Sequence, residues 1–152
     1  MRIDNYNKKV KKLISKLELS AETTAKKRVL KVKKLVEDSI KLGYLTPKLK
    51  KDTIKSKRSK GYLYPEHPLY GLGEENGKSM LRGLRVRKIK NGWRLAPEGK
   101  HHSGLSQQTI WTIHEFGATL TNGGKIPARK PFKTALKNFR IIEEEKIFGE
   151  KI

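Results

Sequence analysis

The sequence predicts an α+β fold in a single domain, with a long N-terminal helix, a small antiparallel sheet, a short helix and a C-terminal helix. Apolar residues recur every three or four positions over the first 42 residues and again after residue 131, the period of one helix face. Between them, residues 85–97 hold an Asn-Gly pair flanked by short arms, which is typical of a β-hairpin. The length of 152 residues suits one domain. Its parts are basic N-terminal helices at 1–43, a long basic loop at 44–79, an α+β core at 80–140 and a tail at 141–152.

Two helical stretches are expected in the N-terminal part. The first covers residues 5–18, with Asp4 as a plausible N-cap. Ser20 resembles a second N-cap, followed by a helix that runs to about residue 42. Gly43 suits the position just after a helix end.

The middle of the chain reads as loop and hairpin. Residues 44–79 hold three prolines and several glycines in irregular order, so we expect a long loop with a short helical turn at 47–55. Residues 80–84 suit one helical turn. The Asn91-Gly92 pair predicts the hairpin's two-residue turn, with Trp93 in the return arm.

The last third predicts two helices around a loop. Ser106 is a good N-cap and Gly117 a good terminator for a short helix, although isoleucine, tryptophan, threonine and phenylalanine between them also suit a strand. Residues 118–125 read as a flexible loop. Pro131 suits the first turn of the last helix, whose apolar stripe runs to Ile142.

Charge dominates the composition. The chain has 36 Lys and Arg against 15 Asp and Glu, a net charge of +21, and only 35% hydrophobic residues. Such a chain attracts polyanions, of which nucleic acid comes first, an acidic protein surface second and anionic lipid third. A solvated face is the competing interpretation of these side chains. The residues expected to face DNA are Lys26, Lys27, Arg28, Lys31, Lys33, Lys34, Lys48, Lys50, Lys51, Lys55, Lys57, Arg58 and Lys60.

No catalytic, metal or cofactor site is expected. The chain lacks cysteine, which excludes disulfides and thiolate chemistry. The pair His114-Glu115 lacks the second histidine, four residues after the first, that a zinc helix needs, because residue 118 is alanine. The glycine-rich stretch at 71–79 has the wrong spacing for a phosphate-binding loop. The other histidines lie in polar loop sequence, and no acidic cluster accompanies them to support nuclease chemistry. They are His67, His101 and His102.

The sequence also predicts neither secretion nor membrane insertion. Residues 1–19 contain no apolar signal core, and no stretch approaches 18 consecutive apolar residues.

A stiffened arm precedes the last helix. Pro127 and Pro131 restrict the backbone on either side of Arg129. An arginine held in this way suits a fixed, bidentate contact, either with a carboxylate of a neighbouring copy or with the loop after Gly117. The alternative is a tight approach to the helix with no further role.

The motifs around this arm resemble the tail-completion and tail-component (head–tail connector, neck) proteins of tailed bacteriophages. The sequence His-Glu-Phe-Gly at 114–117, a short loop, and Ile-Pro-Ala-Arg-Lys-Pro-Phe at 126–132 match that family's corner, with Lys130 inserted. The segments 45–61 and 68–86 match its upstream stretches, with Gly71 or Gly73 where Thr-Gly is common. The resemblance spans roughly residues 45–140.

The resemblance implies a structural virion protein and not an enzyme. It implies a homo-oligomeric ring, six-fold favoured and twelve-fold possible, at the phage neck or tail top, assembled in the host cytoplasm. The implied partners are copies of the chain itself, portal, adaptor or stopper and tail-tube proteins, and packaged DNA in the channel. The implied assembly residues are His114, Glu115, Phe116, Gly117, Ile126, Pro127, Arg129, Pro131 and Phe132.

Two other functions are compatible with the sequence. Composition alone favours a stand-alone basic protein that binds DNA or RNA without sequence preference. A nuclease is the second alternative, against which the scarcity of acidic residues argues.

Overall fold

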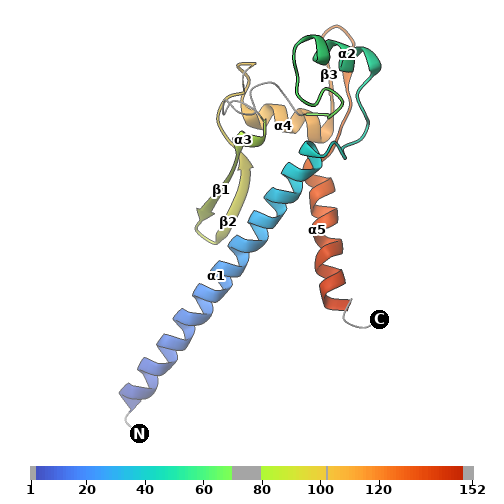
Figure 1. Cartoon of the computed structure of the whole chain (residues 1–152). Helices are drawn as coiled ribbons and strands as arrows, with labels where there is room; N and C mark the ends of the chain where they lie inside the picture. The colour runs from blue at the N-terminus through green and yellow to red at the C-terminus, as the bar shows by residue number, and fades with distance from the viewer. Residues whose placement is uncertain (1–2, 70–79, 102, 149–152) are drawn as a thin grey trace.

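The computed structural model describes residues 3–69, 80–101 and 103–148, and mixes helix with strand (Figure 1). The glycine-rich stretch at 71–79 and His102 lie outside these residues, as does part of the segment 68–86. The elements are α1 (Ile3–Lys41), α2 (Lys51–Ser59), α3 (Met80–Gly83), β1 (Leu84–Ile89), β2 (Gly92–Pro97), α4 (Gln107–Phe116), β3 (Ala118–Thr119), β4 (Lys125–Ile126) and α5 (Pro131–Phe148).

Helix α1 is a single helix of 39 residues, so the expected break at Ser20 is wrong. No glycine or proline interrupts the chain there, and serine inside a helix costs only a few tenths of a kcal/mol relative to better helix formers. The apolar stripe also continues across Ser20, since Leu17 and Ala21 are four residues apart. Two stripes that are in phase belong to one helix.

The hairpin is present, with its turn one residue earlier than expected. Strands β1 and β2 pair antiparallel, with Ile89 opposite Gly92, so Lys90 and Asn91 form the turn. This register places Val86 directly opposite Leu95. Register follows the pairing of apolar side chains on the buried face, and here that pairing decides against an Asn-Gly turn.

Two segments expected to be loops contain structure. Within 118–125 and just beyond it, β3 pairs with β4, and the hydrogen bond from Leu120 N to Gly124 O (2.7 Å) closes the ribbon. Strands of two residues are too short to show alternation in the sequence. The helical turn expected at 47–55 is the nine-residue helix α2, which begins later and runs to Ser59.

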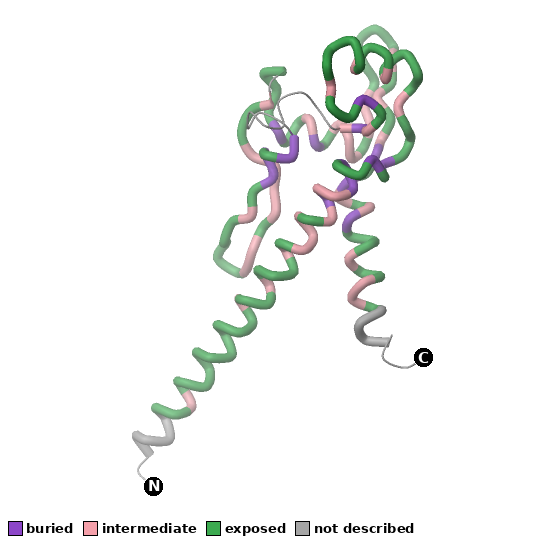
Figure 2. Tube along the Cα trace, viewed as in Figure 1, coloured by how far each residue is buried: buried purple, intermediate pink, exposed green. Residues whose placement is uncertain are grey.

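The core lies at the C-terminal end of α1, where α3, β1, α4 and α5 meet it (Figure 2). Val36 and Ile40 of α1 pack there with Trp111 of α4 and Ala135 of α5. Leu45, from the segment expected to be loop, is 1% exposed and belongs to the same core. Residues 11–21 of α1 lie beyond this core and are exposed, while α5 diverges from α1 towards its C-terminal end (Figures 1 and 2).

None of the helices in the described ranges combines the length and apolar character needed to cross a membrane.

Candidate functional site

The end of α4 and the arm at 126–130 form a corner held by backbone contacts. The carbonyl of His114 accepts hydrogen bonds from Arg129 N (2.7 Å) and Lys130 N (3.1 Å). Gly117 ends α4 with φ at +81°. A Cβ at this position would lie 2.9 Å from the carbonyl oxygen of Ile126 and 3.2 Å from Ala128 N. Both the backbone angle and the close approach of the arm therefore require glycine here.

Glu115 caps the last helix from the neighbouring one. Its carboxylate accepts hydrogen bonds from Phe132 N (3.0 Å) and Lys133 N (3.1 Å), in the first turn of α5. These amides have no partner within the helix, and a negative charge is favoured at a helix N-terminus. The pair His114-Glu115 thus positions the arm through the His114 carbonyl and the start of α5 through the Glu115 carboxylate.

The His114 ring makes no hydrogen bond through Nδ1 to a described residue, and this atom is buried. Burial lowers the pKa of His114 to about 4, and the positive charges of Arg129 and His101 add to the effect. The imidazole is therefore neutral at neutral pH. His114 is therefore joined to the arm by its backbone carbonyl and not by its ring.

Arg129 turns towards the segment after α1. Only 8% of the residue is exposed, and its Nε donates to the carbonyl of Pro47 (3.2 Å). Among the described residues no carboxylate pairs with its guanidinium, and the guanidinium does not bond the loop after Gly117 as one expectation had it. Burial lowers the pKa of Arg129 below its ordinary value. The corner thus holds a buried cation joined to a residue 82 positions away.

The apolar corner residues divide between core and surface. Phe132 packs against Trp111 with ring centroids 4.9 Å apart, and Pro131 is buried beside it. Phe116, in contrast, is 78% exposed. Ile126 is half-buried and Pro127 is exposed.

More than half of the side chains expected to face DNA have partners within the chain. Lys26 lies 4.8 Å from the Trp93 ring centroid, and Lys31 pairs with Glu143 at 3.2 Å. The others with a partner in the chain are Arg28, Lys33, Lys48, Lys57 and Arg58. Five of these seven contacts join α1 to β2 and α5, or α2 to the segment after it, while Lys33 pairs within α1 and Lys48 within the segment before α2. Such side chains are less available to a polyanion than their number suggests.

The remaining six are exposed and form two separate groups. Lys27 and Lys34 lie on α1, and the other four lie on α2 or at its ends. At 1.5 Å per residue, Lys27 is roughly 20 Å from the end of α1, beyond which α2 lies (Figure 1). The group around α2 comprises Lys50, Lys51, Lys55 and Lys60.

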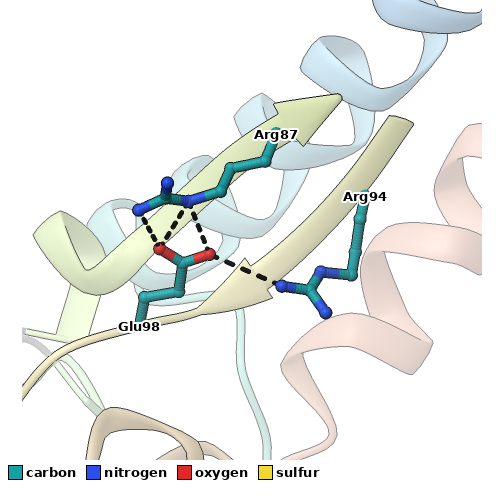
Figure 3. A network of polar contacts seen from close by, with 3 residues as sticks. All are labelled: Arg87, Arg94 and Glu98. Atoms are coloured by element: carbon teal, nitrogen blue, oxygen red, sulfur yellow. Dashed lines mark hydrogen bonds and ion pairs between the residues drawn. The ribbon is translucent and has the colours of Figure 1, made fainter. Parts of the chain in front are cut away.

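An ion-pair network on the hairpin was not expected from the sequence. Arg87 and Arg94 are direct cross-strand partners, an arrangement that repels. The carboxylate of Glu98 lies between them, 2.8 Å from Arg87 Nε and 3.7 Å from Arg94 Nη2 (Figure 3). Hydrogen bonding to Glu98 raises the pKa of Arg87, and the charge of Glu98 adds to the effect. The sequence does not show that Arg87, Arg94 and Glu98 lie together, because this depends on the strand register.

An apolar groove of about 310 Å³ lies between α1, β2 and α5. Val29 and Val32 line it from α1, Leu95 from β2, and Leu136 and Phe139 from α5. Leu136 remains 53% exposed. This groove is a surface on which an apolar side chain of another molecule can pack.

The described part of the chain contains no group of three or more histidine, cysteine, aspartate or glutamate side chains placed to hold a metal ion. Compared with protein-family models, with curated proteins and with solved structures, the chain matches none of them.

Proposed function

We propose that this chain is a structural subunit of the neck or tail top of a tailed bacteriophage, where copies form a ring around the DNA channel. The motifs at 114–117 and 126–132 support membership of this family, and the net charge of +21 supports a position beside the DNA in the channel. The observation that carries the assembly itself is the exposed stretch at residues 11–21, in the first half of α1.

This half of α1 presents an apolar stripe that no described residue covers. Residues 11–21 are all exposed, including Leu13 at 60% and Leu17 at 70%. Together with Ile14 and Ala21 they lie on one face of the helix at spacings of three and four. An apolar face that extends away from the core marks an interaction surface.

A second copy of the chain is the partner that fits this face. The apolar groove between α1, β2 and α5 offers a complementary surface on the same molecule. The stripe and the groove are different surfaces, so their contact is heterologous, and a heterologous contact whose rotation closes generates a ring. The composition agrees, because 35% hydrophobic residues provide only a modest core per copy.

The test compares two leucine substitutions of similar exposure. Leu17→Ser removes a stripe residue, whereas Leu19→Ser removes a side chain that is 66% exposed on the opposite face of α1. We expect native mass measurements at moderate salt to show a closed oligomer for wild type and Leu19→Ser, and monomer for Leu17→Ser. Raised salt is needed because copies with a charge of +21 repel one another.

Imaging of the assembled particle gives the decisive stoichiometry. Six-fold rings are expected at the neck or tail top, and a single copy or a simple dimer there would rule the function out.

A stand-alone nucleic-acid-binding protein is the second candidate, favoured by six lysines of the expected DNA-facing set that are exposed and lack an acidic partner among the described residues. It predicts a protein that stays monomeric at every salt concentration until nucleic acid is added.

A further inference from the structure

A second groove, of about 630 Å³, lies between the segment before α2 and the arm of the corner. Residues 47–50 and Thr53 line one side, and residues 125–127 with Arg129 line the other. We call it the Pro47 groove. Its charged lining residues are all basic, namely Lys48, Lys50, Lys125 and Arg129.

The first observation is the buried cation of the Pro47 groove. Arg129 is 8% exposed, and its guanidinium has one hydrogen bond, to a neutral carbonyl, with no carboxylate partner in the described ranges. A buried charge without a counter-charge is costly, and the cost falls when an anion binds. Lys57 adds positive charge nearby. Burial is the main cause that lowers the pKa of Lys57; Glu66 opposes this, and the charge of Arg129 lowers the pKa further.

The second observation is independent and concerns the start of α2. Lys50 is the N-cap residue of this nine-residue helix and makes no side-chain capping hydrogen bond. Lys50 and Thr53, at the start of the helix, line the Pro47 groove. Uncapped amides and the helix dipole attract an anion to such a position. Asp52 is exposed and does not line the groove.

The anion is more readily found on nucleic acid than on a second copy of this chain. The chain has only 15 Asp and Glu against 36 Lys and Arg, and seven of these acidic side chains already have partners within the chain, so a second copy offers a sparse and mostly positive surface where nucleic acid offers a continuous row of phosphates. The seven are Glu22, Glu37, Glu66, Glu98, Glu115, Glu143 and Glu144.

We propose that the Pro47 groove binds a backbone phosphate of nucleic acid, with Arg129 donating to its oxygens and Lys50 and Lys125 supplying charge at the rim. This inference rests on the proposed function, since it names the contact through which the channel DNA is held. Lys48 lines the groove with the aliphatic part of its side chain, because its Nζ already donates to the carbonyl of Gly43.

The experiment uses the full chain and a short fluorescein-labelled DNA duplex, with binding followed by fluorescence anisotropy over a series of salt concentrations. Arg129→Lys keeps the net charge but loses the planar fork, so affinity should fall about fivefold. Arg140→Lys is the matched control, because Arg140 is exposed on α5 and away from the groove. It should bind within about twofold of wild type.

A second pair of variants guards against a folding defect in Arg129→Lys. The double variant Lys50→Gln with Lys125→Gln removes two rim charges and should make the negative slope of log K against log salt shallower by about 1.8, at about 0.9 per phosphate contact. The matched double variant Lys133→Gln with Lys137→Gln, exposed on α5, should change the slope by less than half as much. Thermal melting of each variant checks that the fold is intact.

The outcomes separate this inference from the proposed function. If both groove variants bind the duplex like their controls, the phosphate site is wrong, even when wild type forms rings. If Arg129→Lys binds DNA normally but no longer assembles, the groove takes a carboxylate of a second copy, which also overturns the phosphate site. If the groove variants lose DNA affinity as expected while wild type never assembles, the phosphate site stands and the ring does not.

Discussion

Glu115 is the residue through which α4 holds the start of α5. Removing its carboxylate leaves the half-buried amide of Phe132 and the exposed amide of Lys133 without this acceptor. Glu115→Ala should therefore lower the free energy of unfolding by about 1–2 kcal/mol, as for loss of an N-cap. Urea unfolding measures this loss. Glu144→Ala, which removes only an exposed pair with Arg140, should cost less than about 0.5 kcal/mol. Equal losses in the two variants would show that Glu115 is not a cap.

His114 makes the corner sensitive to acid. Its folded pKa of about 4 lies below the ordinary value of 6.5, so the folded protein binds the proton less readily than the unfolded chain does. The stability from the neutral ring is present above pH 6.5 and is lost as pH falls towards 4. Between pH 7 and pH 5 the loss is roughly 2 kcal/mol by linkage.

Urea unfolding at these two pH values checks the His114 prediction. His114→Gln, which cannot titrate, should remove most of the pH dependence. A wild-type stability that is the same at pH 7 and pH 5 would contradict the assigned pKa of His114.

At the scale of elements, α1 consists of two halves with different energetics. Ile40 is fully buried in the core, whereas Leu17 is 70% exposed. In monomeric protein, Ile40→Ala should cost about 2–5 kcal/mol through lost burial and a cavity, and Leu17→Ala less than about 0.5 kcal/mol. Chemical denaturation of both variants gives the comparison, and hydrogen exchange should be fast over residues 8–21 and slow over 32–41. Strong protection of the first half in a monomer would mean that another part of the chain covers it.

The whole molecule should bind duplex DNA weakly and without sequence preference. Six lysines of the expected DNA-facing set are exposed and lack a described acidic partner, so the slope of log K against log salt should be about −5 when all of them contact phosphates. Electrophoretic mobility shifts at 50–200 mM salt on two unrelated duplexes provide the measurement. A strong preference for one duplex, or affinity that does not change with salt, would exclude this mode of binding.

Local signals predicted the elements well and their partners poorly. Helix α4 begins after Ser106 and ends at Gly117 as expected, because capping depends on the few residues around a helix end. Ser20 also suggests an N-cap, but α1 continues through it, because the continuous apolar stripe stabilises one helix more than a single serine favours a new start. At the corner, the sequence identified the arm around Arg129, but its contact with Pro47 and the groove could not be predicted.

The sequence by itself determined the long basic helix, the hairpin, the last two helices and the positive charge, since periodicity, turn residues and composition act over a few neighbouring positions. Only the tertiary structure decided that Leu45 enters the core, that Glu115 caps α5 and that Arg129 is buried against a distant segment. It also decided which half of α1 is covered, because α5 and the hairpin reach only the second half (Figure 1). An apolar stripe records that a face must be buried, but its partner depends on how distant segments pack.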